Sequence, residues 1–167
     1  MNGSIKYFLF SFLILFCTIG KAQVCDSVDT SKASLYKKTR KKYQKKVSNK
    51  IYGKVDPDLI FGAANYMRHN NDTTCLQWYR YCIELYRRAY EDNDNKRYQG
   101  KRNVIYAIGK CYYYLSDYKQ SVQWFAKAIK AKTPDICTFY FYSVSLKQLG
   151  QDKDADDAMQ QFNNPPK

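Results

Sequence analysis

The stretch IYAIGKCYYYLSDYKQSVQWFAKAIK, residues 105–130, decides the fold. It lacks the alternation of apolar and polar residues that is typical of strands, and Ser116-Asp117 interrupt it with a turn signal. The break leaves two helix-length pieces joined by very few residues, and so short a connection makes neighbouring helices antiparallel. Residues 105–130 are therefore predicted to form a helical hairpin.

Turn signals divide the rest of the chain in the same way. Asp56-Pro57 indicates a helix start, because aspartate suits the N-cap and proline suits the first helical position. Further breaks, starts or ends are expected at 69–72, 91–101, 133–134, 150–152 and 165–166. The helices between them are ~10–18 residues long, so the predicted fold class is all-α, built from antiparallel helical hairpins.

The hairpin of residues 105–130 is related in sequence to the segment that begins at Ile136, at a shift of 34 residues. When the segment from Arg102 is placed over it, Gly109 falls on Ser143, and Ser121 falls on Ala155. Small residues then coincide where two helices must approach closely, and each hairpin of such an array leaves an apolar face that only its neighbour can bury. This internal period favours a stack of similar hairpins over a non-repeating helical bundle.

This pattern resembles the tetratricopeptide repeat (TPR) family, whose units also repeat every 34 residues. The matching positions of the best unit are Ile108-Gly109, Tyr112, Asp117-Tyr118, Ser121, Phe125, Ala128 and, displaced by one residue, Pro134. Two weaker units lie at 56–89, with Ala63, Tyr66, Cys75, Tyr79 and Cys82 in the corresponding positions, and at 134–162, with Leu149-Gly150. The resemblance implies a short TPR-like solenoid of three hairpins over residues 56–163, with a polar insertion at 91–101 and a tail at 164–167.

Residues 1–23 differ from the rest of the chain. A basic start, an apolar run over residues 7–19 and a small, polar end are typical of a secretory signal peptide, and the run is shorter than the ~20 residues of a membrane span. An uncleaved anchor is the alternative, whereas the bulky Phe16 before Cys17 disfavours a lipoprotein. We expect a periplasmic or secreted protein. Removal of residues 1–23 lowers the formal net charge from +13 to +11, because they contain two lysines and no acid.

Cysteines and histidine offer little for metal binding. The five later cysteines are Cys25, Cys75, Cys82, Cys111 and Cys137; they form no Cys-x-x-Cys pair, and His69 is the only histidine. An oxidising compartment permits disulfides, but an odd number cannot pair completely within one chain. Cys75 and Cys82 are expected to fill small packing positions, whereas Cys25 is the best candidate for a bridge to the helical body or to another chain.

The sequence contains no recognised catalytic motif. A phosphate-binding glycine loop, a Gly-x-Ser-x-Gly elbow and a His-Glu-x-x-His helix are all absent. The acidic run over residues 152–157 lacks the central glycine and closing glutamate of a calcium loop. We expect no enzyme activity, no catalytic residue, no metal and no cofactor.

Residues 32–54 hold ten basic side chains and no acid. The candidate patch for an anionic surface comprises Lys37, Lys38, Arg40, Lys41, Lys42, Lys45 and Lys46. An apolar stripe of Leu35, Tyr36, Tyr43 and Val47 at helical spacing indicates a helix that docks on the first hairpin. Two interpretations stay open: a solvated capping helix, or a patch that attracts anionic lipid, polysaccharide or acidic protein. Nucleic acid is the least expected target of an exported protein.

The family resemblance also implies a binding surface. In TPR proteins the first helices of the hairpins line a concave groove that binds peptides or helices, and tyrosine and arginine are common interface anchors. The corresponding residues are Ile60, Met67, Arg68, Tyr106, Lys110, Tyr113, Tyr114, Tyr140, Lys147 and Gln148. The alternative is that these aromatic side chains only pack. The family's carboxylate clamp has no match in this sequence.

The leading functional hypothesis is an exported TPR-like module that binds an acidic protein or peptide in this groove, as an adaptor or as an immunity-type binder. The alternative is a cationic protein of the cell envelope that binds anionic lipid or polysaccharide through residues 32–54. No apolar stretch after residue 23 is long enough to span a membrane.

Overall fold

The computed structural model describes residues 23–91, 102–131 and 135–165. All regular elements within these ranges are helical, as predicted. A short 3₁₀ helix, η1 (Thr30–Lys32), precedes α2 (Ala33–Ser48), α3 (Pro57–His69), α4 (Cys75–Glu91), α5 (Arg102–Tyr114), α6 (Tyr118–Lys130), α7 (Ile136–Gln148) and α8 (Asp152–Asn163). The predicted signal peptide, except its last residue, lies outside the described residues, as does the predicted insertion after Glu91.

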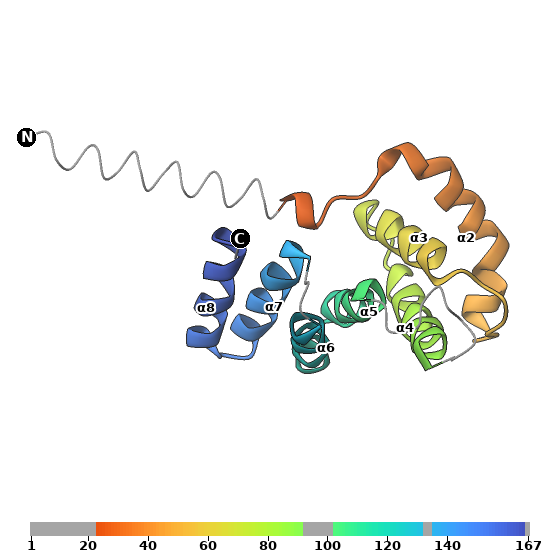
Figure 1. Ribbon diagram of the computed structural model, residues 1–167. Coiled ribbons are helices and arrows are strands. Elements are labelled where there is room, and N and C mark those ends of the chain that lie inside the picture. The colour runs from red at the N-terminus through yellow and green to blue at the C-terminus, as the bar shows by residue number, and fades with distance from the viewer. Residues whose placement is uncertain (1–22, 92–101, 132–134, 166–167) are drawn as a thin grey trace, which may run out of the picture.

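The helices pack in the order of the sequence. α3 and α4, α5 and α6, and α7 and α8 form three successive hairpins, and each hairpin also packs against the next through α4 with α5 and α6 with α7 (Figure 1). α2 lies against α3 at one end of the stack. The prediction of an all-α fold of stacked helical hairpins is confirmed.

The turns form where the sequence places polar breaks. The side chains of Asp56 and Asp117 cap α3 and α6 by accepting hydrogen bonds from backbone amides. Ser116 has a positive φ of 59°, and Gly150 has a φ of 73° in the turn before α8. α7 begins at Ile136, beyond the predicted start at 133–134, because Asp135 is its N-cap and accepts from the Cys137 amide at 2.8 Å.

Small residues bring the two helices of each hairpin together. The Ser121 hydroxyl donates to the Gly109 carbonyl at 3.2 Å, and the Ser143 hydroxyl donates to the Ala155 carbonyl at 2.7 Å. A Cβ atom on Gly109 would lie 2.7 Å from the buried Phe125 ring, so the backbone and the ring are already at contact distance. The Ser121 and Ser145 hydroxyls, 3.0 Å apart, also link α6 to α7 of the next hairpin. The two intra-hairpin contacts join the small residues that the internal period relates.

α2 docks on the first hairpin, as its apolar stripe predicts. Tyr43 and Val47 are buried in the same core as α3 and α4, and Thr39 is buried beside them. The prediction for Leu35 was wrong, since its side chain is 40% exposed. Leu35 belongs to the same i, i+4 row as Thr39, Tyr43 and Val47, but it lies in the first turn of α2, and burial of this row begins only at Thr39.

Among the described residues, no helix combines the length and the apolar character that a membrane crossing needs.

Candidate functional site

The segment 23–29 lies against the first helices of the three hairpins. Cys25 forms a disulfide with Cys137 in the first turn of α7, across a sequence separation of 112 residues. Figure 1 shows this part of the chain beside the start of α7, before it continues towards α2. We call the surface that contacts it the inner face; it comprises Arg68 and His69 of α3, Lys110 and Tyr114 of α5, and Cys137 of α7.

Asp26 is the central ligand of the inner face. Its carboxylate oxygen Oδ1 accepts from Arg68 Nη2 at 2.8 Å and also from the Tyr114 hydroxyl. The Arg68 guanidinium lies over the Tyr114 ring, 4.2 Å from its centroid, and this stacking fixes the plane of its N–H donors. Hydrogen bonds to an ionised carboxylate are shorter and stronger than neutral ones, so Arg68 and Tyr114 form an anion-binding pair.

Backbone carbonyls of the same segment are also bound. Lys110 Nζ donates to the Cys25 carbonyl at 3.1 Å, and His69 Nε2 lies 2.9 Å from the Asp26 carbonyl, to which an Nε2–H donates. The inner face thus binds one carboxylate and two consecutive carbonyls. The segment forms a helical turn there, because residues 23–25 are helical and the Ser27 amide donates to the Val24 carbonyl at 3.3 Å. The inner face therefore holds a turn of chain through its main chain and one carboxylate.

Lys110 occupies an unusual position for a lysine, because its side chain is only 6% exposed. The ammonium lies among aromatic rings, 4.6 Å from the centroid of Phe141 and 5.5 Å from that of Tyr114. Burial lowers the pKa of Lys110 to about 8, although the Asp26 carboxylate opposes that shift. Burial also raises the pKa of Tyr114, and the negative charge of Asp26 raises it further. Tyr114 is therefore a hydrogen-bond donor throughout the physiological pH range.

Three of the predicted partner-binding residues converge on this site: Arg68, Lys110 and Tyr114. Tyr106, Tyr113 and Tyr140 lie nearby but are half-buried against Phe141, so they pack as much as they line a surface. Met67 and Ile60 take no part, because both are buried in the core between α2, α3 and α4. Lys147 and Gln148 are exposed in the last turn of α7.

The sequence did not predict that the segment 23–29 would contact the residues of the inner face. Cys25 was expected in a flexible segment; it is buried, and its bridge is to the helical body, through Cys137. Asp26 and His69 were not predicted as site residues. The sequence did hold one signal for Asp26, namely its position next to Cys25. A disulfide that brings Cys25 to the basic inner face also brings the Asp26 carboxylate to that face. Cys75 and Cys82 are free thiols at buried packing positions, as predicted.

The basic patch of α2 is a separate surface. Lys37, Lys38, Lys41, Lys42 and Lys45 are exposed or half-exposed, and Lys46 extends its ammonium over the Tyr43 ring. Arg40 forms an ion pair with Asp72, 2.7 Å between Nη2 and Oδ2.

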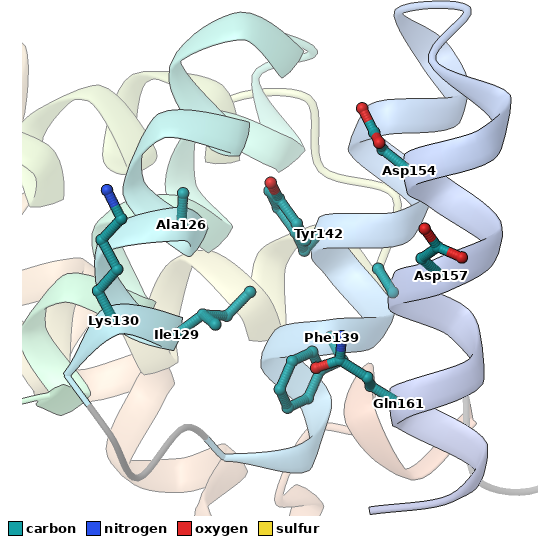
Figure 2. Close-up of a pocket in the computed structure, with 9 residues that line it drawn as sticks. Ala126, Ile129, Lys130, Phe139, Tyr142, Asp154, Asp157 and Gln161 are labelled. Atoms are coloured by element: carbon teal, nitrogen blue, oxygen red, sulfur yellow. The ribbon is translucent and has the colours of Figure 1, made fainter.

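A cavity of about 280 Å³ opens between α6, α7 and α8. Figure 2 shows Lys130 of α6 on one side and Asp154 and Asp157 of α8 on the other, with Tyr142 of α7 between them. Its charged side chains stand apart around the rim. The described residues contain no group of three or more histidine, cysteine or acidic side chains arranged to hold a metal ion.

Residues 59–136 match the model of a family described as uncharacterized protein conserved in bacteria (DUF2225). The match covers slightly less than half of the chain and includes Arg68, His69, Lys110 and Tyr114, whereas Cys25, Asp26 and Cys137 lie outside it. No curated protein and no solved structure matches the chain.

Proposed function

We propose that this protein is an exported, TPR-like binding module whose inner face holds a short acidic segment of a partner protein. The observation that carries the proposal is the contact between Asp26 and the pair Arg68 and Tyr114. The chain's own segment lies across α3, α5 and α7 in the way that the family resemblance leads us to expect of a peptide ligand.

The assignment to the TPR type is supported by the spacing of the small residues. Gly109 and Ser121 meet within one hairpin, and Ser143 and Ala155 meet within the next, in both cases 12 residues apart. Ala63 and Cys75 have the same spacing in the first hairpin, and both are buried. Three hairpins with the same spacing of small buried residues form a stack whose first helices share one side, which is how repeat proteins create extended binding surfaces.

The acidic character of the ligand is supported by the donors on the inner face. Arg68 and Lys110 are both cationic at neutral pH, and the Tyr114 hydroxyl adds a donor. Charged groups held in a partly buried site favour a ligand of opposite charge and suppress wrong partners. An adaptor of the cell envelope or an immunity-type protein that neutralises its partner are the two roles that such a module fits.

A periplasmic or secreted location is supported by two features. Residues 1–23 have the order of a signal peptide, and the Cys25–Cys137 disulfide is of a kind that persists in oxidising compartments.

The test uses a peptide of residues 23–31 in which serine replaces Cys25, labelled for fluorescence anisotropy. The receptor is the Cys25→Ser/Asp26→Ala variant, in which the chain's own segment has lost its disulfide and its carboxylate. We expect saturable binding that weakens about tenfold or more with Arg68→Gln, because a charge-assisted hydrogen bond contributes about 1.5–3 kcal/mol.

Two controls accompany that measurement. Arg80→Gln removes the same charge from an exposed position on α4 and should leave affinity unchanged. A peptide with asparagine in place of Asp26 should bind weakly. Absence of binding, or equal binding by the Arg68→Gln variant, would show that the inner face is not a peptide site.

A second candidate function is favoured by the lysines of α2. Arg40 forms an ion pair with Asp72. The other basic side chains of the patch include five exposed lysines, which present their charge to solvent. Binding to anionic vesicles should fall steeply with salt and be lost when Lys37, Lys38, Lys41, Lys42 and Lys45 are changed to glutamine. Deletion of residues 32–54 is unsuitable, because Tyr43 and Val47 belong to the core. Vesicle binding that survives the five substitutions would exclude this function.

A further inference from the structure

We propose that the Cys25–Cys137 disulfide latches the segment 23–29 over the inner face, and that a dithiol reductant releases this segment to admit an acidic segment of a partner protein. The inference rests on the binding function proposed above and specifies how that site is controlled. The resident segment is then a competitor carried on the same chain.

The resident segment occupies the atoms that a partner would use. Arg68 Nη2 and the Tyr114 hydroxyl are both bonded to Asp26, and Lys110 Nζ is bonded to the Cys25 carbonyl. Because the Lys110 side chain is buried and its ammonium already donates to the Cys25 carbonyl, a partner's carbonyl would have to displace this residue to reach it. Binding of a partner therefore requires Cys25 and Asp26 to leave first.

The attachment depends on few contacts. Residues 27–29 line a cavity of about 220 Å³ whose other walls include Phe61 and Asn65 of α3, so this part of the segment does not fill the surface beneath it. On the other side of Cys25, Val24 is largely exposed to solvent. Cys25 and Asp26 thus carry most of the attachment, and the covalent bond is the one contact that a competing ligand cannot displace.

A thiol is expected to approach the disulfide from the side of Cys137, the less buried of its two residues. Cys25 is buried, but Cys137 is half-buried in the first turn of α7. A thiolate of the reductant attacks the Cys137 sulfur, forms a mixed disulfide with it, and releases the Cys25 sulfur as a thiolate that takes up a proton. The second thiolate of the reductant then attacks the reductant's other sulfur, which is bonded to Cys137 in the mixed disulfide. This step expels the Cys137 thiolate, which is protonated in turn. Two electrons and two protons pass to the protein, and the dithiol becomes a disulfide.

Reduction does not remove the competitor, since residues 27–32 still connect it to α2. A short tether keeps the effective concentration of the segment near the millimolar range. A partner must therefore bind more tightly than Asp26 alone does, and the reduced protein should bind a test peptide more weakly than a variant without the Asp26 carboxylate.

The experiment measures binding of the labelled 23–31 peptide to the wild-type protein before and after treatment with dithiothreitol. The gain of two hydrogens in the intact mass confirms reduction, and circular dichroism confirms that the helices persist. We expect the affinity for the peptide to be about tenfold or more higher after reduction than before it. The Cys25→Ser variant is the matched control; it should bind equally well with and without dithiothreitol, at the level of the reduced wild type.

The outcomes separate this inference from the binding function. If the Cys25→Ser/Asp26→Ala variant binds the peptide but neither the reduced wild type nor the Cys25→Ser variant binds better than the oxidised protein, the latch is wrong and the binding site stands. If the double variant does not bind, the proposed function fails. Loss of helicity on reduction would show that the disulfide is a structural brace, and this also overturns the latch.

Discussion

Asp26 and Arg68 form an ion pair across 42 residues of sequence, with 2.8 Å between the carboxylate oxygen Oδ1 and the guanidinium nitrogen Nη2. Both side chains are only partly exposed, and the guanidinium also stacks on the Tyr114 ring. This geometry distinguishes the pair from the exposed ion pairs of the surface, and it leads to a measurable difference in their energies.

The Asp26–Arg68 pair should show coupling in a double-mutant cycle. With Asp26→Asn and Arg68→Gln, we expect a coupling energy of about 1 kcal/mol in the free energy of unfolding, measured by urea denaturation. The matched pair is Glu84 with Arg88, whose arginine is more exposed than Arg68, and it should couple by less than about 0.5 kcal/mol. Equal coupling of the two pairs would contradict the view that the inner face is a built anion site.

Lys110 should make stability depend on pH in a particular direction. Its folded pKa, about 8, lies below the unfolded value of 10.5, so between these values the unfolded chain binds more protons and the contribution of Lys110 to stability rises with pH. Relative to a Lys110→Met variant, the wild type should gain about 1–2 kcal/mol between pH 7 and pH 9.5. The comparison cancels the ionisation of tyrosines and thiols.

Gly109→Ala should destabilise the protein, although alanine is the better helix former by about 1 kcal/mol. A Cβ atom there would lie 2.7, 2.8 and 3.1 Å from three atoms of the buried Phe125 ring, which itself packs on Phe141. Overpacking of this kind typically costs about 1–3 kcal/mol, so a net loss of about 1 kcal/mol is expected by thermal or urea unfolding. Gly53→Ala, with nothing within 4 Å of the added atom, should change stability by less than about 0.5 kcal/mol.

Cys82 and Cys111 should resist alkylation in the folded protein. Both side chains are fully buried, and burial raises the pKa of the Cys82 thiol, so little reactive thiolate forms. Iodoacetamide treatment followed by peptide mapping should leave both unmodified in native buffer and modify both in urea. The Cys25 and Cys137 peptides should become modified only after reduction. Rapid modification of Cys82 in native buffer would contradict the packing described for α4 and α5.

The local sequence predicted the hairpins well because their signals are local. Turn residues at Asp56-Pro57, Ser116-Asp117 and Gly150 mark positions where the backbone needs a cap or a positive φ, and the structure places its turns there. The small residues Gly109 and Ser121 predicted a close helix contact, because only small side chains permit one, and the contact is present. These features follow from rules that act over a few residues or one repeat.

The sequence could not place residues 23–29. Nothing in the neighbourhood of Cys25 indicates which of four other cysteines it meets, since the choice depends on how three hairpins bring Cys137 to the inner face. For the same reason Lys110 looked like an exposed groove residue, whereas the segment that buries it lies 85 positions away in the chain. The sequence also placed Leu35 in one row with Tyr43 and Val47, and only the docking of α2 decided that burial of this row begins at Thr39.

By itself, the sequence determined the helical class, the positions of the turns and the period of the stack, because capping, helix propensity and small-residue spacing act locally. Only the tertiary structure decided that the segment 23–29 covers the inner face. The disulfide and the ion pair that hold it join distant residues, so they depend on the relative positions of whole helices. Asp26, Arg68 and Tyr114 become a site only when α3 and α5 lie side by side and the Cys25–Cys137 bond holds the segment across them.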